Sequence, residues 1–355
     1  MLISMGDRQV GAGEPVYLVF EAGPTHYGLE SAMTLATMAK EAGADAIKFQ
    51  IADHKRLITT KDLPFSYGIL TDRDSGTIET VTEPLIDIWE RRFLSRDEWS
   101  SLKAHCDTLG INFFATVFFE EDVEFLTELG VHSFKIASQD IAHMDLIRYC
   151  AGKQIPIQID TGNATIGEVE RAVDWIRDEG NEKIIINHCP SGYPARTESI
   201  NLRVIRTLKE MFPYPVAFSD HTPGWEMDIA ARALGADIIE KTITLDRTIR
   251  SCEHVMSLEP PEMPVFIKAM RELEIALGNS RCIVTQEARD SRESVRRSGF
   301  LVRPVKKGER LQRSDFDLRR PGHGVLKTDD YFHYLGRTFS RDLPTEHMVT
   351  VDDLE

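Results

Sequence analysis

The sequence predicts a (β/α)8 barrel followed by a small β-rich domain. Its 355 residues exceed the roughly 250 residues of such a barrel by the length of one small module. Eight short runs rich in β-branched and aromatic residues alternate with helical patterns, which is typical of parallel βα units. Eight consecutive units favour a closed barrel over an open sheet.

The eight runs have the length of buried strands, and the helical segments between them end at glycines. The predicted strands are 16–21, 46–50, 113–116, 133–138, 156–161, 184–189, 215–220 and 238–244. The predicted helices are 31–42, 96–109, 121–129, 166–179, 227–234 and 264–277. A glycine follows each helix at the position where a left-handed C-cap is expected.

Two segments depart from this alternation. Residues 51–93, between the second and third strands, form a segment too long for a simple connection. Such a segment is expected to be a lid, a binding loop or a small inserted helix. The alternative is an element that only packs on the barrel or contacts a partner in a dimer. The polar stretch 286–293 is typical of a linker. We therefore expect a barrel domain over 1–282, a linker over 283–293 and a second domain over 294–355.

Composition narrows the classes of function. A formal net charge of −15 argues against a nucleic-acid groove or an anionic membrane surface, because both require basic stripes. The five cysteines lack CxxC spacing, so reduced and mostly buried thiols are expected rather than a zinc knuckle or a disulfide framework. The first 15 residues show no signal pattern, and no apolar run approaches the ~18 residues that span a bilayer, so we expect a cytoplasmic protein.

Polar residues stand at the end of every predicted strand. In a barrel these carboxyl ends converge on one mouth, where active sites of this fold lie. The residues at or just after the strand ends include Glu21, Lys48, Gln50, Thr116, Lys135, Ser138, Asp160, His188, Ser191, Tyr193, Ser219, His221, Glu240 and Thr242.

Several of these strand-end motifs together resemble the sialic acid synthase family over nearly the whole chain. The matching stretches are EAG at 21–23, AGADAIKFQ at 42–50, FKIAS at 134–138, SDHTPG at 219–224, SLEP at 257–260, and RRS, KGE and RPG at 296–298, 307–309 and 320–322. The resemblance implies condensation of phosphoenolpyruvate with an N-acylated sugar aldehyde to a sialic-acid-like nonulosonate, with release of phosphate. It also implies a C-terminal antifreeze-like (SAF) domain and a domain-swapped homodimer.

Phosphoenolpyruvate carries about three negative charges, so its site needs cations and neutral donors. Lys48 and Lys135 are the expected cations. The expected neutral donors are Gln50, Thr116, Ser138 and Ser219. The alternative is that the lysines are structural, ion-paired across the top of the barrel, and that the hydroxyls only satisfy backbone groups.

The resemblance implies that two histidines hold a divalent metal, Mn²⁺ or Mg²⁺. This metal would polarise the carbonyl group of the aldehyde. His221 matches the first, whereas Thr242 stands where the second is expected. Three outcomes are open: weaker binding by His221 with a carboxylate such as Glu240, compensation by Asp160, or loss of the ancestral activity.

The resemblance also implies a site for the acceptor sugar, with some residues that match the family and others that depart from it. Glu21 would orient or deprotonate a water or hydroxyl, and Ser191 and Tyr193 would line the sugar. Glu253 replaces an expected aspartate and Asp160 an expected serine, which, with Thr242, suggests a sugar other than N-acetylmannosamine. Arg320 of the antifreeze-like domain would reach the partner subunit's substrate, or would instead form a surface ion pair with Asp317 or Glu309.

His26 and His188 are expected to be structural rather than ligands.

Two rival functions remain open. One rival is a synthase for phosphorylated sugars, which would need extra arginines. The other is a catalytically silent carbohydrate-binding homologue, favoured by Thr242 and Glu253 but opposed by the retained lysines, Ser138 and His221.

Overall fold

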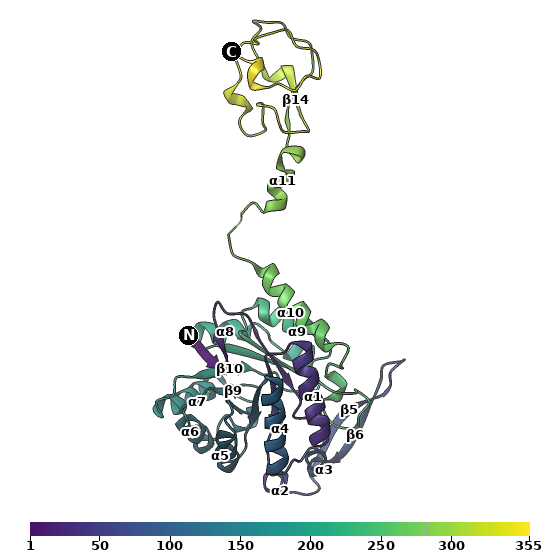
Figure 1. Cartoon of the computed structure of the whole chain (residues 1–355), viewed down its shortest axis with the longest axis vertical. Helices are drawn as coiled ribbons and strands as arrows, with labels where there is room; N and C mark the ends of the chain where they lie inside the picture. Colours follow the sequence, from purple (N-terminus) through teal and green to yellow (C-terminus); the bar gives the residue numbers. More distant parts are fainter. Residues whose placement is uncertain (282) are drawn as a thin grey trace. The chain divides into compact units, whose positions relative to one another are not determined.

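The computed structural model describes residues 1–281 and 283–355, which form two compact units, Met1–Gly278 and Asn279–Glu355 (Figure 1). Cys282 lies outside the described residues, and the other four cysteines are free and buried.

The first unit is a closed barrel of eight parallel strands in the order β3-β4-β7-β8-β9-β10-β11-β12. The strands are β3 (Tyr17–Glu21), β4 (Ala46–Gln50), β7 (Asn112–Thr116), β8 (Phe134–Ile136), β9 (Ile157–Asp160), β10 (Ile184–His188), β11 (Val216–Asp220) and β12 (Ile238–Thr242). Every one coincides with a predicted strand to within two residues at each end. The predicted barrel is confirmed.

Helices surround the barrel and bury one face each against it. They are α1 (Leu29–Ala42), α4 (Arg96–Leu109), α5 (Glu120–Glu128), α6 (Met144–Gly152), α7 (Ile166–Asp178), α8 (Val204–Met211), α9 (Glu226–Ala233) and α10 (Met263–Leu277). Among them, α6 and α8 were not predicted, and neither begins with a capping side chain. By contrast α4 has a Ser95–Glu98 capping box at its start and Gly110 in the left-handed conformation at its end, both readable from the sequence.

A short hairpin closes the N-terminal end of the barrel. It consists of β1 (Leu2–Met5) and β2 (Arg8–Gly11), which pair antiparallel. Ile3, Met5 and Val10 are buried in one cluster with the first barrel residues, such as Tyr17 and Val19. The larger core lies between the strands and the surrounding helices. With this end filled, the open end of the barrel is the one with the strands' carboxyl ends.

The long segment between β4 and β7 folds into a small subdomain. It contains α2 (His54–Leu57), the antiparallel hairpin β5 (Pro64–Asp72) and β6 (Thr77–Pro84), and α3 (Leu85–Glu90). At the hairpin tip, Arg73 pairs with Asp246 at 2.6 Å and with Glu259. Tyr67 and Ile88 pack in one buried cluster with Cys252. The subdomain is therefore attached to the segment that follows β12.

The second unit has its own small core and little regular structure. It contains α11 (Gln286–Val295) and the antiparallel strands β13 (Ser298–Leu301) and β14 (Phe316–Arg319). Most of the stretch expected to be a linker is thus helical. No residue of α11 is buried. Short 3-10 turns complete the chain at Ser138–Asp140, Thr197–Ser199, His254–Met256, Arg313–Asp315, Tyr331–His333 and Val351–Asp353. None of the helices described is both long and apolar enough to cross a membrane.

Candidate active site

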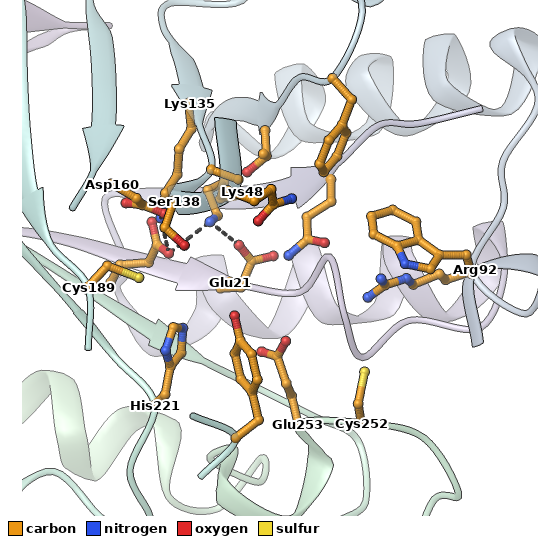
Figure 2. Close-up of a pocket in the computed structure, with 18 of the residues that line it drawn as sticks. Glu21, Lys48, Arg92, Lys135, Ser138, Asp160, Cys189, His221, Cys252 and Glu253 are labelled. Carbon is orange, nitrogen blue, oxygen red and sulfur yellow. Dashed lines mark hydrogen bonds and ion pairs between the residues drawn. The ribbon is translucent and has the colours of Figure 1, made fainter. Parts of the chain in front are cut away.

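A pocket of about 290 Å³ opens at the carboxyl ends of the barrel strands. This size is at the lower limit of small-molecule sites, which hold roughly 300–1,000 Å³, so small polar metabolites fit better than polymers. Figure 2 shows the residues around it. The lining residues predicted from sequence are Glu21, Lys48, Gln50, Thr116, Lys135, Ser138, Asp160, Tyr193, His221, Glu240 and Glu253.

Two buried lysines and three buried carboxylates form a continuous ion-pair network at the base of the pocket. Lys48 contacts Glu21 and lies 2.8 Å from Glu240 Oε1. Lys135 lies 2.6 Å from the same Oε1 atom and 3.2 Å from Asp160 Oδ2. All five side chains are nearly inaccessible to solvent. The structure therefore contains the ion pairs that the structural-lysine alternative predicted, and it places them on the pocket wall.

The network fixes the charge states of its members. Burial opposes ionisation of Glu240, but Lys135 and Lys48 outweigh it and hold the pKa of this carboxyl well below its usual range. Burial also lowers the pKa of Lys48, to about 8, although Glu240 counteracts it. For Lys135, burial is outweighed by Asp160 and Glu240, which raise its pKa. Burial raises the pKa of Asp160 in spite of Lys135, so Asp160 takes up a proton more readily than Glu240 does.

Hydrogen bonds position the network from below and from the side. Ser219 Oγ donates to Glu240 Oε1 at 2.6 Å, so it lies under the network and does not line the pocket. Asn187 Nδ2 donates to Asp160 at 2.7 Å. The Gly23 amide donates to Glu21, and a side chain at residue 23 would approach within 2.5 Å of that carboxylate. Glycine is required there by close approach of the backbone to Glu21.

His221 and Tyr193 lie together on another wall. The ring centroids are 4.8 Å apart, and His221 Nδ1 lies 3.0 Å from the Pro190 carbonyl oxygen. A carbonyl only accepts, so Nδ1 carries the proton and Nε2 of the neutral ring is left as an acceptor. Glu253 stands nearby with φ +71°, a left-handed conformation that is strained for a residue other than glycine. Burial raises the pKa of its carboxyl.

The donor set does not fit the two-histidine metal site. Within residues 1–281 and 283–355, no group of three or more His, Cys, Asp and Glu side chains is placed to hold a metal ion. Thr242 is buried on β12 and offers only a neutral hydroxyl. Glu240 and Asp160 are engaged by the lysines. We therefore derive no step through a metal.

The pocket also contains residues that the sequence did not single out. The inserted subdomain contributes Phe65, Leu85, Trp89 and Arg92, so this segment covers the barrel mouth. Cys189 and Cys252 also line the pocket, and burial raises the pKa of both thiols, to about 11 for Cys252. Both are therefore protonated rather than nucleophilic.

Arg92 is the most unusual of these residues. It is only 8% exposed, and neither Nε nor Nη1 has a hydrogen-bond partner. Its guanidinium lies over the Trp89 ring, 3.7 Å from the centroid. A charge buried without a partner costs several kcal/mol, so such a group is expected to meet a ligand. The adjacent pair of arginines at 91 and 92 gave no sign in the sequence of which one would be buried.

Two further predicted residues are Ser191, which is not among the residues that line the pocket, and Arg320, which belongs to the second unit. Ser191 donates to the Gly162 carbonyl oxygen and to Asn163 at 3.1 Å each, on the exposed loop after β10. Arg320 is exposed in the second unit, directly after β14. The surface pairs that were its alternative are formed by other arginines: Asp317 pairs with Arg319 and Glu309 with Arg303.

The two histidines expected to be structural are both buried, His26 after β3 and His188 at the end of β10. His26 packs edge-on against Phe49 and Trp99, and burial lowers its pKa to about 3. His188 Nε2 lies 2.7 Å from the Ile200 carbonyl oxygen. Neither lines the pocket.

The chain is similar in sequence and in fold to known proteins. An uncharacterized protein of Methanocaldococcus jannaschii is 34% identical over 353 residues, 99% of this chain and 98% of its own. The N,N'-diacetyllegionaminic acid synthase of Legionella pneumophila is 32% identical over 91% of this chain and 90% of its own. The crystal structure of N-acetylneuraminic acid synthetase from Leptospira borgpetersenii superimposes with a TM-score of 0.71 at 28% identity, over 82% of this chain and 95% of that one.

A family model matches residues 35–282, which cover most of the barrel and every residue of the ion-pair network except Glu21. The full-length similarity extends the match through the second unit. The chain belongs to the NeuB family.

Proposed function

We propose that this chain is a nonulosonate synthase that condenses phosphoenolpyruvate with an N-acylated sugar aldehyde and releases phosphate. The observation that supports this most directly is the position of Lys48 and Lys135, which project from neighbouring parts of the barrel into one small pocket. Family membership supplies the class of reaction. The names of the relatives include synthases of legionaminic, pseudaminic and neuraminic acids.

The reaction balances with water as the third reactant. C3 of phosphoenolpyruvate attacks the aldehyde carbon, whose oxygen becomes a hydroxyl. Water adds at C2, the C2–O bond to phosphate breaks, and a 2-keto acid and phosphate leave. Lys48 and Lys135 would bind the phosphate and carboxylate, and Gln50, Thr116 and Ser138 would donate from the rim.

Proton transfer would fall to groups that are already oriented. His221 Nε2 is an acceptor that can take a proton from water, because the Pro190 carbonyl holds the tautomer. Glu21 is held by the Gly23 amide and would orient a hydroxyl of the acceptor. Ionised Glu240 keeps the two lysines in place. The side chains expected to face the sugar are Tyr193, Glu253 and Asp160. The resemblance also predicts sugar contacts from Ser191 and from Arg320 in the antifreeze-like domain of the partner subunit, and these contacts stay predictions.

The test is release of phosphate from phosphoenolpyruvate with a panel of N-acyl hexosamines, with EDTA or with Mn²⁺ or Mg²⁺. We expect release that depends on the sugar and falls at least 100-fold in Lys135→Met, since charge-assisted contacts to a phosphate are lost. Lys40→Met, an exposed lysine on α1, is the control and should behave as wild type. A fold check by circular dichroism separates lost chemistry from lost structure.

A second candidate is a catalytically silent carbohydrate-binding homologue. It is favoured by Thr242 in place of a metal ligand and by lysines whose charges are already neutralised. It predicts sugar binding without phosphate release under any metal condition and no thermal stabilisation by phosphoenolpyruvate. A ligand at 100 times its dissociation constant adds about 2.7 kcal/mol to stability, so binding would be visible as a raised melting temperature.

A further inference from the structure

Arg92 is a buried cation on the pocket wall with no partner for its charge. In the part of the chain that the structure describes, no carboxylate forms an ion pair with it, and its Nε and Nη1 atoms lack hydrogen bonds. Its neighbour Arg91 points elsewhere and pairs with Glu83 at 2.5 Å. An arginine stays charged at any physiological pH and offers five donors in one plane. Arg92 therefore presents unsatisfied charge to whatever enters the pocket.

The other pocket cations are not free in this way. Glu240 lies between Lys48 and Lys135, and both lysines have a further carboxylate partner. An incoming anion therefore meets ammonium groups whose charge is already shared with carboxylates. At Arg92 it meets no ion-paired carboxylate among the described residues, and one face of the guanidinium packs on the Trp89 ring. The edge of a guanidinium fits a planar or tetrahedral oxyanion.

Arg92 belongs to the acceptor side of the pocket. Figure 2 shows it with Cys252 and Glu253, away from Lys135 and Asp160. The ionisable groups that act on it are Cys252, Glu253, Tyr193 and Arg91. Burial raises the pKa of the Glu253 carboxyl and of the Cys252 thiol, so both tend toward their neutral forms and leave the charge of Arg92 uncompensated.

We propose that Arg92 binds an anionic group of the acceptor, a carboxylate or a phosphate, and that the acceptor is therefore an acidic sugar derivative rather than a neutral one. This inference rests on the proposed synthase function. Arg92 acts in it as a specificity-determining residue and takes no part in bond making.

The experiment compares three acceptors of one sugar: the neutral N-acyl hexosamine, its uronate and its 6-phosphate. Phosphate release gives kcat/KM for each with wild type, Arg92→Gln, Arg92→Lys and the control Arg91→Gln. We expect wild type to prefer one acidic acceptor, and Arg92→Gln to lower kcat/KM for that acceptor about 10- to 150-fold, as for loss of a charged hydrogen bond. The neutral acceptor should be unaffected, Arg92→Lys should be intermediate, and Arg91→Gln should match wild type. The uronate and phosphate arms identify the anion.

Three results would overturn the inference. They are a wild-type preference for the neutral acceptor, an equal loss for all acceptors in Arg92→Gln, and a loss of phosphoenolpyruvate affinity in that variant, measured by calorimetry. If no acceptor supports phosphate release, the synthase proposal fails by itself. Calorimetric titration of the uronate and the 6-phosphate then tests Arg92 alone: binding that Arg92→Gln abolishes sustains the anion site, and no binding removes it.

Discussion

Asp160→Asn is expected to tighten the binding of phosphoenolpyruvate. Asp160 is one of three carboxylates that surround two lysines, so the five-residue network carries one excess negative charge when all are ionised. Asparagine has the same shape and removes that charge. Lys135 keeps Glu240 as a partner at 2.6 Å, so it stays charged and in place.

The magnitude follows from the geometry of Lys135. Asp160 lies 3.2 Å from its ammonium nitrogen. An anion bound on the opposite side, at a charge-assisted distance of about 2.8 Å, would be roughly 6 Å from Asp160. At an effective dielectric constant of about 20, two like charges at that separation repel by about 3 kcal/mol. Because burial raises the pKa of Asp160 and blunts this repulsion, we expect a 10- to 100-fold decrease in the dissociation constant.

Calorimetric titration of phosphoenolpyruvate into both proteins, in buffer with EDTA, measures this directly. Asp178→Asn is the matched control, because it removes the same charge from an exposed carboxylate paired with Arg148 at 2.9 Å. The control should leave the dissociation constant unchanged. Unchanged or weaker binding by Asp160→Asn would refute the reasoning, since Asp160 would then not repel the bound anion.

Two further predictions concern Lys48 and Gly23. With the pKa of Lys48 lowered from 10.5 to about 8, kcat/KM for phosphoenolpyruvate should fall above about pH 8 in wild type but not in Lys48→Arg. Between about pH 8 and 10.5 the Lys48 amine holds more protons in the unfolded chain than in the folded one. Lys48 therefore makes the protein more stable as the pH rises through this range. A loss of stability in thermal melts over the same range would contradict the lowered pKa of Lys48. Gly23→Ala should destabilise by about 1–3 kcal/mol in chemical denaturation, because its new carbon would meet Glu21 at 2.5 Å and the Gln50 backbone nitrogen at 2.8 Å. Gly152→Ala, where the added carbon meets nothing within 4 Å, is the control, and equal stability of the two variants would show that the Glu21 loop yields freely.

The barrel could be predicted because its signals are local and repeated. Each strand is a short apolar run, and each predicted helix ends at a glycine such as Gly43 or Gly110, which the structure places in the left-handed conformation. Once eight such units are recognised, topology alone brings Lys48 and Lys135 to one mouth. Their placement needed no knowledge of side-chain contacts.

The covering subdomain was harder to predict, although one signal was available. Residues Phe65, Tyr67 and Ile69 alternate with the small residues Ser66 and Gly68, and the turn after them ends in Gly76, which is a hairpin pattern. The burial of Arg92 had no such signal. It depends on Trp89 and on packing between segments far apart in the sequence, including the region of Cys252. Tertiary contacts of this kind are not encoded in any local period.

The two ends of the pocket therefore differ in what an anion meets there. At Lys135 it meets an ammonium group already paired with Glu240 and Asp160, and uptake of a proton by Asp160, whose pKa is raised by burial, would ease its entry. At Arg92 two buried donors, Nε and Nη1, have no hydrogen-bond partner, so an anion of the acceptor would meet no ion-paired carboxylate there. Asp160→Asn should therefore change the affinity for phosphoenolpyruvate, and Arg92→Gln should change the preference among acceptors. The two effects should be additive in the double variant because the two side chains share no contact.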